Sequence, residues 1–285
     1  MRQILLWAML IISTAMFAQD YPFLSATSKR IYMSDYADHL NAFPKETRDS
    51  LINNTVSFKE NGTRYNKAYS DSIAKAKDFY RYTTRVYKDT IAKTYTYVMH
   101  WRTDAEMEAD GKAFQKSSEE DEENRKKLMG SKLDELALTD MDGNTHTLET
   151  LAGKIIVIDF WFVNCSACIQ EMPELNKMRE KFGTDNVAWF GITFDKKEKV
   201  TKFLEKVKFD FTLIPESQHL VDRFGIKFFP TTLIIDSDHE IVYTGKLGGM
   251  SGRADEISKA LKKVIKKEKK RKKVSVTAGP VERVE

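Results

Sequence analysis

The stretch from Lys154 to Glu174 reads KIIVIDFWFVNCSACIQEMPE, and it decides the fold of the second half of the chain. Its first part is an almost uninterrupted apolar run, which is typical of a strand buried on both faces. After Asn164 the spacing of the apolar residues becomes helical, and Cys165 and Cys168 lie at that change. The sequence therefore predicts a buried strand that ends at a pair of cysteines opening a helix.

The position of the two cysteines indicates reactive thiols. The first turn of a helix offers unpaired N–H groups and the positive end of the helix dipole, both of which favour a thiolate. Cys165 comes first and is the expected nucleophile, while Cys168 lies about one turn further on and can attack a mixed disulfide formed at Cys165. They are the only 2 cysteines among 285 residues, so no other thiol of the chain can pair with them.

These motifs resemble thioredoxin-fold thiol-disulfide oxidoreductases, in particular the secreted or membrane-tethered bacterial branch that includes the TlpA and ResA proteins. DFWFVNCSAC matches that family's strand-to-CxxC junction, and Glu171–Pro173 matches its glutamate and helix-bending proline. Phe229-Pro230-Thr231 matches its cis-proline loop. The resemblance covers residues 131–267. Asn164 and the Ser-Ala pair between the cysteines depart from the family's usual residues, so the motif does not predict a reduction potential.

The resemblance implies a fold and a set of site residues. The fold is expected to be α/β, a thioredoxin fold with a central mixed sheet flanked by helices, preceded by a mainly helical N-terminal region. Cys165 would be the catalytic nucleophile and Cys168 the resolving thiol. Phe229 and Pro230 would bind substrate, because the backbone before the proline can pair with an extended segment. Without the resemblance, Pro230 reads equally well as a plain strand-start proline.

Three further residues are site candidates. Asp159 stands in the predicted strand, where burial would raise its pKa and allow it to accept the proton of Cys168. Glu171 is placed to do the same from the helix. The alternatives are a capping or surface carboxylate for Asp159 and an ordinary helix-surface glutamate for Glu171. Trp161 precedes the motif and either faces the substrate, shielding the site, or packs into the core.

The expected activity is thiol-disulfide exchange, most plainly the reduction of protein disulfides, and it needs no cofactor. By resemblance, the partners are disulfide-containing client proteins and a membrane thiol relay that donates electrons. The net charge of +4 is small for 285 residues and gives no indication of nucleic-acid binding. The residues themselves do not choose between reduction and oxidation or isomerisation.

Other interpretations of the cysteine pair remain open. A copper-delivery protein of related fold would use Cys165, Cys168 and a histidine such as His219 or His239. A zinc site needs about four ligands, and the 5 histidines show no paired spacing with the cysteines. The Pro-x-x-x-Thr-x-x-Cys turn of peroxiredoxins is absent from the sequence. A non-enzymatic alternative is a partner-binding protein whose thioredoxin-like domain has only a vestigial redox role.

The N-terminus predicts export. Arg2 is followed by an uncharged apolar run from Ile4 to Ala18, which is shorter than the roughly 20 residues that span a bilayer. We interpret residues 1–19 as a signal peptide, with an uncleaved anchor as the alternative. The predicted location is periplasmic or otherwise extracytoplasmic, where disulfides form and persist.

Residues 20–128 contain no motif with a known function. Most of the tyrosines of the chain lie here, and helical spacing from Tyr65 and over 34–54 favours a mainly helical region. Residues 80–101 fit a hairpin and a continuing helix equally well. The tyrosines indicate either a surface for a partner protein or rings packed within a small domain. The charged segment 103–127 predicts a solvated helix or linker.

The last part of the chain is strongly basic. Residues 262–273 hold nine Lys or Arg and one Glu, so residues 268–285 are predicted to be a disordered basic tail. This positive charge has two interpretations: it attaches the protein weakly to an anionic membrane surface, or it is the solvated end of a helix.

Overall fold

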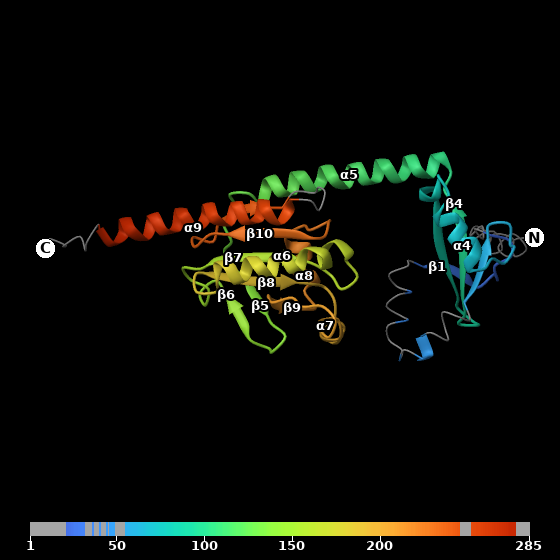
Figure 1. Cartoon of the computed structure of the whole chain (residues 1–285), viewed down its shortest axis with the longest axis horizontal. Coiled ribbons are helices and arrows are strands. Elements are labelled where there is room, and N and C mark those ends of the chain that lie inside the picture. Colours follow the sequence, from blue (N-terminus) through green and yellow to red (C-terminus); the bar gives the residue numbers. More distant parts are fainter. Residues whose placement is uncertain are drawn as a thin grey trace, which may run out of the picture. The chain divides into compact units, whose positions relative to one another are not determined.

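The computed structural model of the chain describes residues 21–31, 36, 40, 44, 46–48, 55–245 and 252–277. The chain divides into two compact units, Met1–Lys112 and Ala113–Glu285, which run from blue to green and from green to red in Figure 1. The predicted signal peptide lies outside the described residues, as does most of the helix predicted over 34–54.

The N-terminal unit contains a four-stranded sheet with the order β1-β3-β4-β2. The strands are β1 (Ser28–Ile31), β2 (Val56–Lys59), β3 (Tyr82–Asp89) and β4 (Tyr95–Trp101). β3 and β4 pair antiparallel as a hairpin, and β2 pairs parallel to β4. The helical spacing from Tyr65 corresponds to the short helix α4 (Lys67–Ala74), and η2 (Phe79–Arg81) follows it.

The described residues of this unit correct the prediction of a mainly helical region. Residues 80–101 form the hairpin rather than a continuing helix. Their many Tyr, Thr and Val side chains suit a pleated, half-buried surface. The rings of Tyr36 and Tyr95 pack at 4.8 Å, and Tyr87 is also buried, so part of the tyrosine set forms the core of this unit.

The charged segment forms helix α5 (Asp104–Leu128), within which the division between the two units falls. The C-terminal unit then builds a five-stranded sheet with the order β11-β10-β7-β8-β9. Its strands are β7 (Ile155–Phe160), β8 (Val187–Ile192), β9 (Thr212–Ile214), β10 (Thr231–Ile235) and β11 (Ile241–Thr244), with β5 (Ala137–Thr139) and β6 (Thr145–Thr147) as a separate hairpin. β7, β8 and β9 are parallel, whereas β10 runs antiparallel to β7 and β11.

Helices cover both faces of this sheet (Figure 1). α6 (Ser166–Phe182), α7 (Lys197–Leu204) and α9 (Arg253–Thr277) pack on the face that Ile155, Val157 and Trp161 occupy. α8 (Gln218–Arg223) and the β5–β6 hairpin pack on the opposite face, with Ile156 and Ile158. Every residue of β7 is buried, so the central mixed sheet flanked by helices is confirmed.

Helix α9 extends further than predicted. It continues to Thr277, so the expectation of disorder from residue 268 is wrong as far as that residue. Glu268 is buried and accepts a hydrogen bond of 2.5 Å from Ser237, while Arg271 lies 2.5 Å from Asp238. These contacts with the β10–β11 turn support the added turns. None of the helices in the described residues is both long and apolar enough to cross a membrane.

Candidate active site

The two cysteines form a disulfide at the junction of β7 and α6. Cys165 is the N-cap residue of α6, and its Sγ accepts a hydrogen bond of 3.1 Å from the backbone N–H of Cys168. Cys165 is 5 % exposed and Cys168 only 1 % exposed. Cys165, at the helix N-terminus, is therefore the more exposed residue of the two.

The peptide bond between Phe229 and Pro230 is cis, as the resemblance implied. Thr231 follows as the first residue of β10 and pairs with Phe160, at the end of β7 from which the chain continues to the cysteines. Within the described part of the chain, neither the N–H nor the C=O of Phe229 has a hydrogen-bond partner. The backbone of Phe229 thus makes no hydrogen bond within the described residues, and its role in substrate binding stays a prediction.

A cluster of three phenyl rings adjoins the disulfide. Phe162 packs at 5.6 Å from Phe194 and at 5.3 Å from Phe229, and the last two rings are 5.8 Å apart. Phe194 follows β8 and is 36 % exposed. Sequence reasoning missed Phe194, although an aromatic residue directly after a second buried strand could have indicated it.

Trp161 does not face this cluster, which corrects its assignment to substrate binding. Its side chain is completely buried and packs against Phe203 and Phe209. Side chains alternate along an extended chain, so Trp161 follows Val157 into the core beneath α6, whereas the ring of Phe162 packs with Phe194 and Phe229. The core-packing alternative is the one that the structure supports.

A second missed residue, Asp195, holds the loop that precedes the cysteines. It is buried, and its Oδ2 accepts a hydrogen bond of 2.6 Å from the backbone N–H of Val163. Oδ2 also accepts a hydrogen bond of 3.2 Å from Thr193, and Lys199 pairs with Oδ1 at 2.7 Å. The sequence signal that could have indicated Asp195 is an acidic residue just beyond the carboxyl end of a buried parallel strand.

The two predicted carboxylates, Asp159 on β7 and Glu171 on α6, belong to one network. Asp159 is 1 % exposed, and Thr232 donates a hydrogen bond of 2.7 Å to its Oδ1. Glu171 accepts two hydrogen bonds, of 3.0 and 2.9 Å, from the Nε of Arg253. The structure therefore excludes the surface interpretation of Asp159 and the ordinary helix-surface interpretation of Glu171.

Arg253 joins the two acids and was not predicted. Its Nη2 donates a hydrogen bond of 2.8 Å to Thr232 and lies 3.9 Å from Oδ1 of Asp159. A Cβ at Gly245 would lie 2.8 Å from Nη1 of Arg253, so glycine leaves the space through which the guanidinium reaches the acids. One cation thus faces two buried carboxyl groups.

This environment changes the acidity of Asp159. The pKa of Asp159 is raised to about 7, mainly by burial and also by the negative charge of Glu171, whereas Arg253 and the hydrogen bond from Thr232 act in the opposite direction. A carboxyl group with a pKa near neutrality can both accept and return a proton under physiological conditions.

The positions of the histidines do not support a metal site at the cysteines. His219 lies on α8, on the sheet face opposite to α6, and His239 lies in the β10–β11 turn, beyond the end of β10 remote from Pro230. Among the residues that the structure describes, no group of three or more His, Cys, Asp or Glu side chains is placed to hold a metal.

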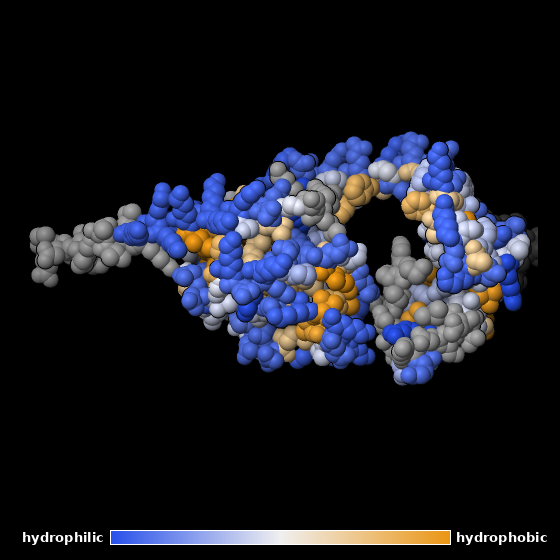
Figure 2. Space-filling view, viewed as in Figure 1, coloured by the Kyte–Doolittle hydropathy of each residue, from blue (hydrophilic) through white to orange (hydrophobic). Residues whose placement is uncertain are grey.

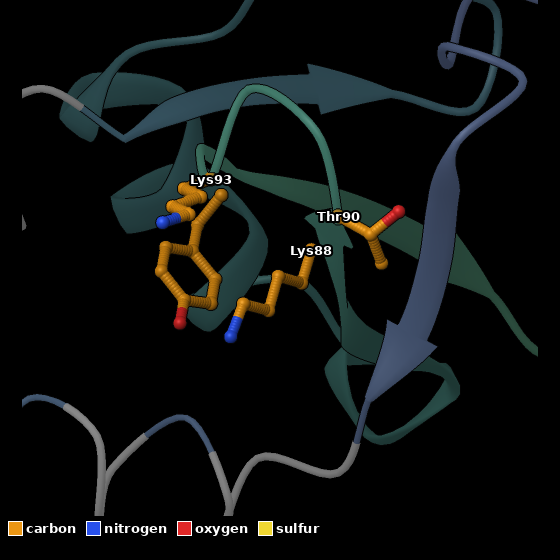
Figure 3. A pocket seen from close by; sticks show the side chains of 4 residues that line it. Lys88, Thr90 and Lys93 are labelled. Carbon is orange, nitrogen blue, oxygen red and sulfur yellow. The ribbon is translucent and has the colours of Figure 1, made fainter.

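The N-terminal unit has a separate hollow of about 260 Å³ at its β3–β4 hairpin. Lys88, Thr90, Lys93 and Tyr95 line it (Figure 3). Both cysteines of the chain lie in the C-terminal unit, away from this hollow in sequence.

Comparison with known proteins agrees with this geometry. Residues 129–244 match the AhpC/TSA family. The thiol-disulfide oxidoreductase ResA of Halalkalibacterium halodurans is 29 % identical over 116 residues, which are 40 % of this chain and 65 % of ResA. ResA of Geobacillus thermodenitrificans is 27 % identical over 123 residues, 42 % of this chain and 71 % of that protein. The chain thus spans 65 % of the length of the first relative.

Solved structures include similar chains as well. A putative thiol:disulfide interchange protein DsbE from Chlorobium tepidum has 23 % identity and a TM-score of 0.44, over 48 % of this chain and 96 % of that chain. The thioredoxin domain of a thiol-disulfide oxidoreductase from Bacteroides vulgatus has 25 % identity and a TM-score of 0.40, over 46 % and 96 %.

The fold of the C-terminal unit is thioredoxin-like, and its sequence is similar to proteins named thiol-disulfide oxidoreductases. Residues 129–244 match the AhpC/TSA family, and the curated relatives cited above carry the name ResA.

Proposed function

We propose that this protein reduces disulfide bonds of client proteins outside the cytoplasm, using Cys165 and Cys168 as a dithiol. The observation that carries the proposal is the cysteine pair at the N-terminus of α6, next to a cis-proline loop with an unpaired backbone and above a buried carboxyl group. The apolar run from Ile4 to Ala18 supports export.

The proposed reaction consists of two exchanges. In the reduced protein, the Cys165 thiolate attacks one sulfur of the client disulfide; the client S–S bond breaks, and the other client sulfur leaves as a thiolate. Cys168 then loses its proton and attacks Sγ of Cys165, which releases the second client thiolate and forms the Cys165–Cys168 disulfide. Two electrons pass from the protein to the client, and a membrane thiol relay is the proposed donor that restores the dithiol.

We propose Asp159 as the group that accepts the proton of Cys168. Asp159 faces the core beneath α6, and its pKa of about 7 permits protonation near neutral pH. Glu171 instead directs both carboxylate oxygens at Arg253. Glu171 therefore acts on the reaction through the charge that it places near Asp159.

Measuring the reduction potential of the cysteine pair tests the proposed direction of electron flow. The mature protein is equilibrated in glutathione or dithiothreitol buffers, and the thiol state is read by alkylation. We expect a potential below about −200 mV, more reducing than that of typical protein disulfide oxidants and isomerases. A value near −120 mV, on the order of that of a strong oxidant, would instead make the protein a donor of disulfides and overturn the reductase proposal.

Replacing Asp159 by asparagine should change how stability depends on pH. The pKa of Asp159 rises from 3.8 to about 7 in the folded protein, so the folded state binds a proton that the unfolded state releases. The resulting stabilisation is fully present below about pH 4 and is lost as the pH rises through about 7. Asp159→Asn keeps an acceptor oxygen for Thr232 and removes this dependence.

We expect Asp159→Asn to be more stable than the parent protein by about 2 kcal/mol at pH 8 and to lose that advantage near pH 4. Urea unfolding of the disulfide-bonded protein measures this difference without titration of the cysteines. Asp185→Asn, at an exposed position, serves as the matched control. Parallel pH profiles for the parent and Asp159→Asn would show that Asp159 carries no shifted proton.

A further inference from the structure

We propose that a strip of phenylalanines, running from the disulfide onto helix α5, docks the apolar chain segment that flanks a client's disulfide. The strip combines two groups of rings, the cluster Phe162, Phe194 and Phe229 and the pair Phe114 and Phe228, which are joined through the consecutive residues Phe228 and Phe229. This inference rests on the proposed reduction of protein disulfides and adds the class of client. Phe114 lies before the segment that matches the AhpC/TSA family, so it is an addition to that fold in this chain.

Phe114 is the unusual member of the strip. It is 59 % exposed on α5, a helix whose other side chains are mostly charged or polar. Its ring meets the ring of Phe228 edge to face at 5.8 Å. An aromatic side chain left exposed on a polar helix, beside a second one, indicates a contact surface.

The position of α5 in the C-terminal unit is fixed by polar contacts with the segment that leads into the cis-proline loop. Asn124 donates hydrogen bonds of 2.8 and 3.2 Å to the carbonyl oxygens of Phe224 and Gly225. A Cβ at Gly225 would lie 2.8 Å from Nδ2 of Asn124, and Glu120 forms an ion pair with Lys227. These contacts hold α5 against residues 224–227, directly before Phe228 and Phe229.

The occupant follows from the chemistry along the strip. The unpaired N–H and C=O of Phe229 suit an extended backbone, and the neighbouring disulfide requires that this backbone carry a cysteine. Phenyl rings offer no charge to recognise, so they select side chains that bury apolar area. Figure 2 shows that hydrophobic residues gather on the C-terminal unit around α7 and α8. We therefore assign the strip to disulfides flanked by leucine, phenylalanine or similar residues.

The test compares three disulfides as oxidants of the reduced full chain. Two are peptides with one disulfide each, flanked by Leu and Phe or by Ser and Gly, and the third is the small aromatic disulfide DTNB. The rate constant of each single turnover is measured for the parent, Phe114→Ala, Phe114→Leu and Met129→Ala. Met129 is also exposed, at 46 %, and lies outside the strip, so its variant is the matched control.

We expect Phe114→Ala to slow reduction of the apolar peptide about fivefold, the effect of losing one moderate contact. The rates with the polar peptide and with DTNB should stay unchanged, as should all rates of Met129→Ala, and Phe114→Leu should recover most of the loss. Equal slowing of both peptides or of DTNB, or no slowing at all, would overturn the docking assignment.

Three further outcomes separate the docking surface from the proposed function. Self-association of the parent protein that disappears in Phe114→Ala would assign the strip to a second copy of the chain and overturn client docking. A reduced parent protein that fails to react with DTNB and with both peptides would overturn the proposed function itself. Reaction of the parent with all three disulfides, without discrimination by Phe114, would leave the reductase standing and remove only the docking surface.

Discussion

Cys165→Ser is expected to abolish the reduction of protein disulfides, lowering turnover by at least about a thousandfold, because the serine hydroxyl supplies no thiolate. The N-terminus of α6 and the hydrogen bond from the N–H of Cys168 act on this one sulfur. Cys168 is nearly inaccessible and cannot replace Cys165 as the attacking group. The loss is measured with reduced protein and a disulfide-bonded client, followed by thiol alkylation.

Cys168→Ser is the informative partner of this variant. It should still carry out the first exchange and then accumulate a mixed disulfide between Cys165 and the client, visible as a band on a non-reducing gel. If cells that carry Cys165→Ser show the same phenotype as cells with the parent protein, the enzymatic role is contradicted. That result would favour the alternative of a partner-binding protein with a vestigial redox domain.

Arg253→Met is expected to destabilise the folded protein by about 3 kcal/mol, because it leaves the carboxyl groups of Glu171 and Asp159 in the core without their cation. Methionine retains much of the apolar stem of arginine, so the lost charge dominates. The loss of stability should be larger near pH 8 than near pH 5, because more of the carboxylate charge is uncompensated at the higher pH. Urea unfolding of the disulfide-bonded protein measures the effect.

A double-mutant cycle makes this prediction specific. Combining Arg253→Met with Glu171→Gln removes the stranded charge, so the double variant should be more stable than Arg253→Met alone. Lys263→Met replaces an exposed residue on the same helix and should change stability by less than about 0.5 kcal/mol. Additive effects of the two substitutions would mean that Arg253 and Glu171 do not depend on one another.

Local patterns were sufficient to predict the central part of the site. The buried strand and the helix capped by Cys165 follow from residues adjacent in sequence, whereas the cis-proline before β10 was expected only from the family resemblance. The roles of Trp161 and Phe162 could not be separated in this way, because alternation states that they point to opposite sides but not which side α6 covers. The hairpin of the N-terminal unit was undecided for a related reason, since its pairing with β1 and β2, which are distant in sequence, leaves no pattern within the hairpin itself.

The missed residues depend on contacts between distant parts of the chain. Arg253 is 82 residues from Glu171, and Asp195 is 32 residues from Val163, whose N–H it binds. Neither contact leaves a pattern in the local sequence. Phe114 was missed because an isolated phenylalanine in a charged segment has no partner until α5 is placed beside residues 224–228.

The location of Arg253 bears on the order in which the protein becomes functional during synthesis. The family match ends at residue 244, where the sheet is complete and both cysteines and both acids are present. The arginine that balances those acids comes nine residues later, at the beginning of α9. A nascent chain that has emerged only to the end of the sheet therefore carries both cysteines and both acids but lacks the cation that balances these acids. The complete site thus needs more of the chain than the segment that matches the family.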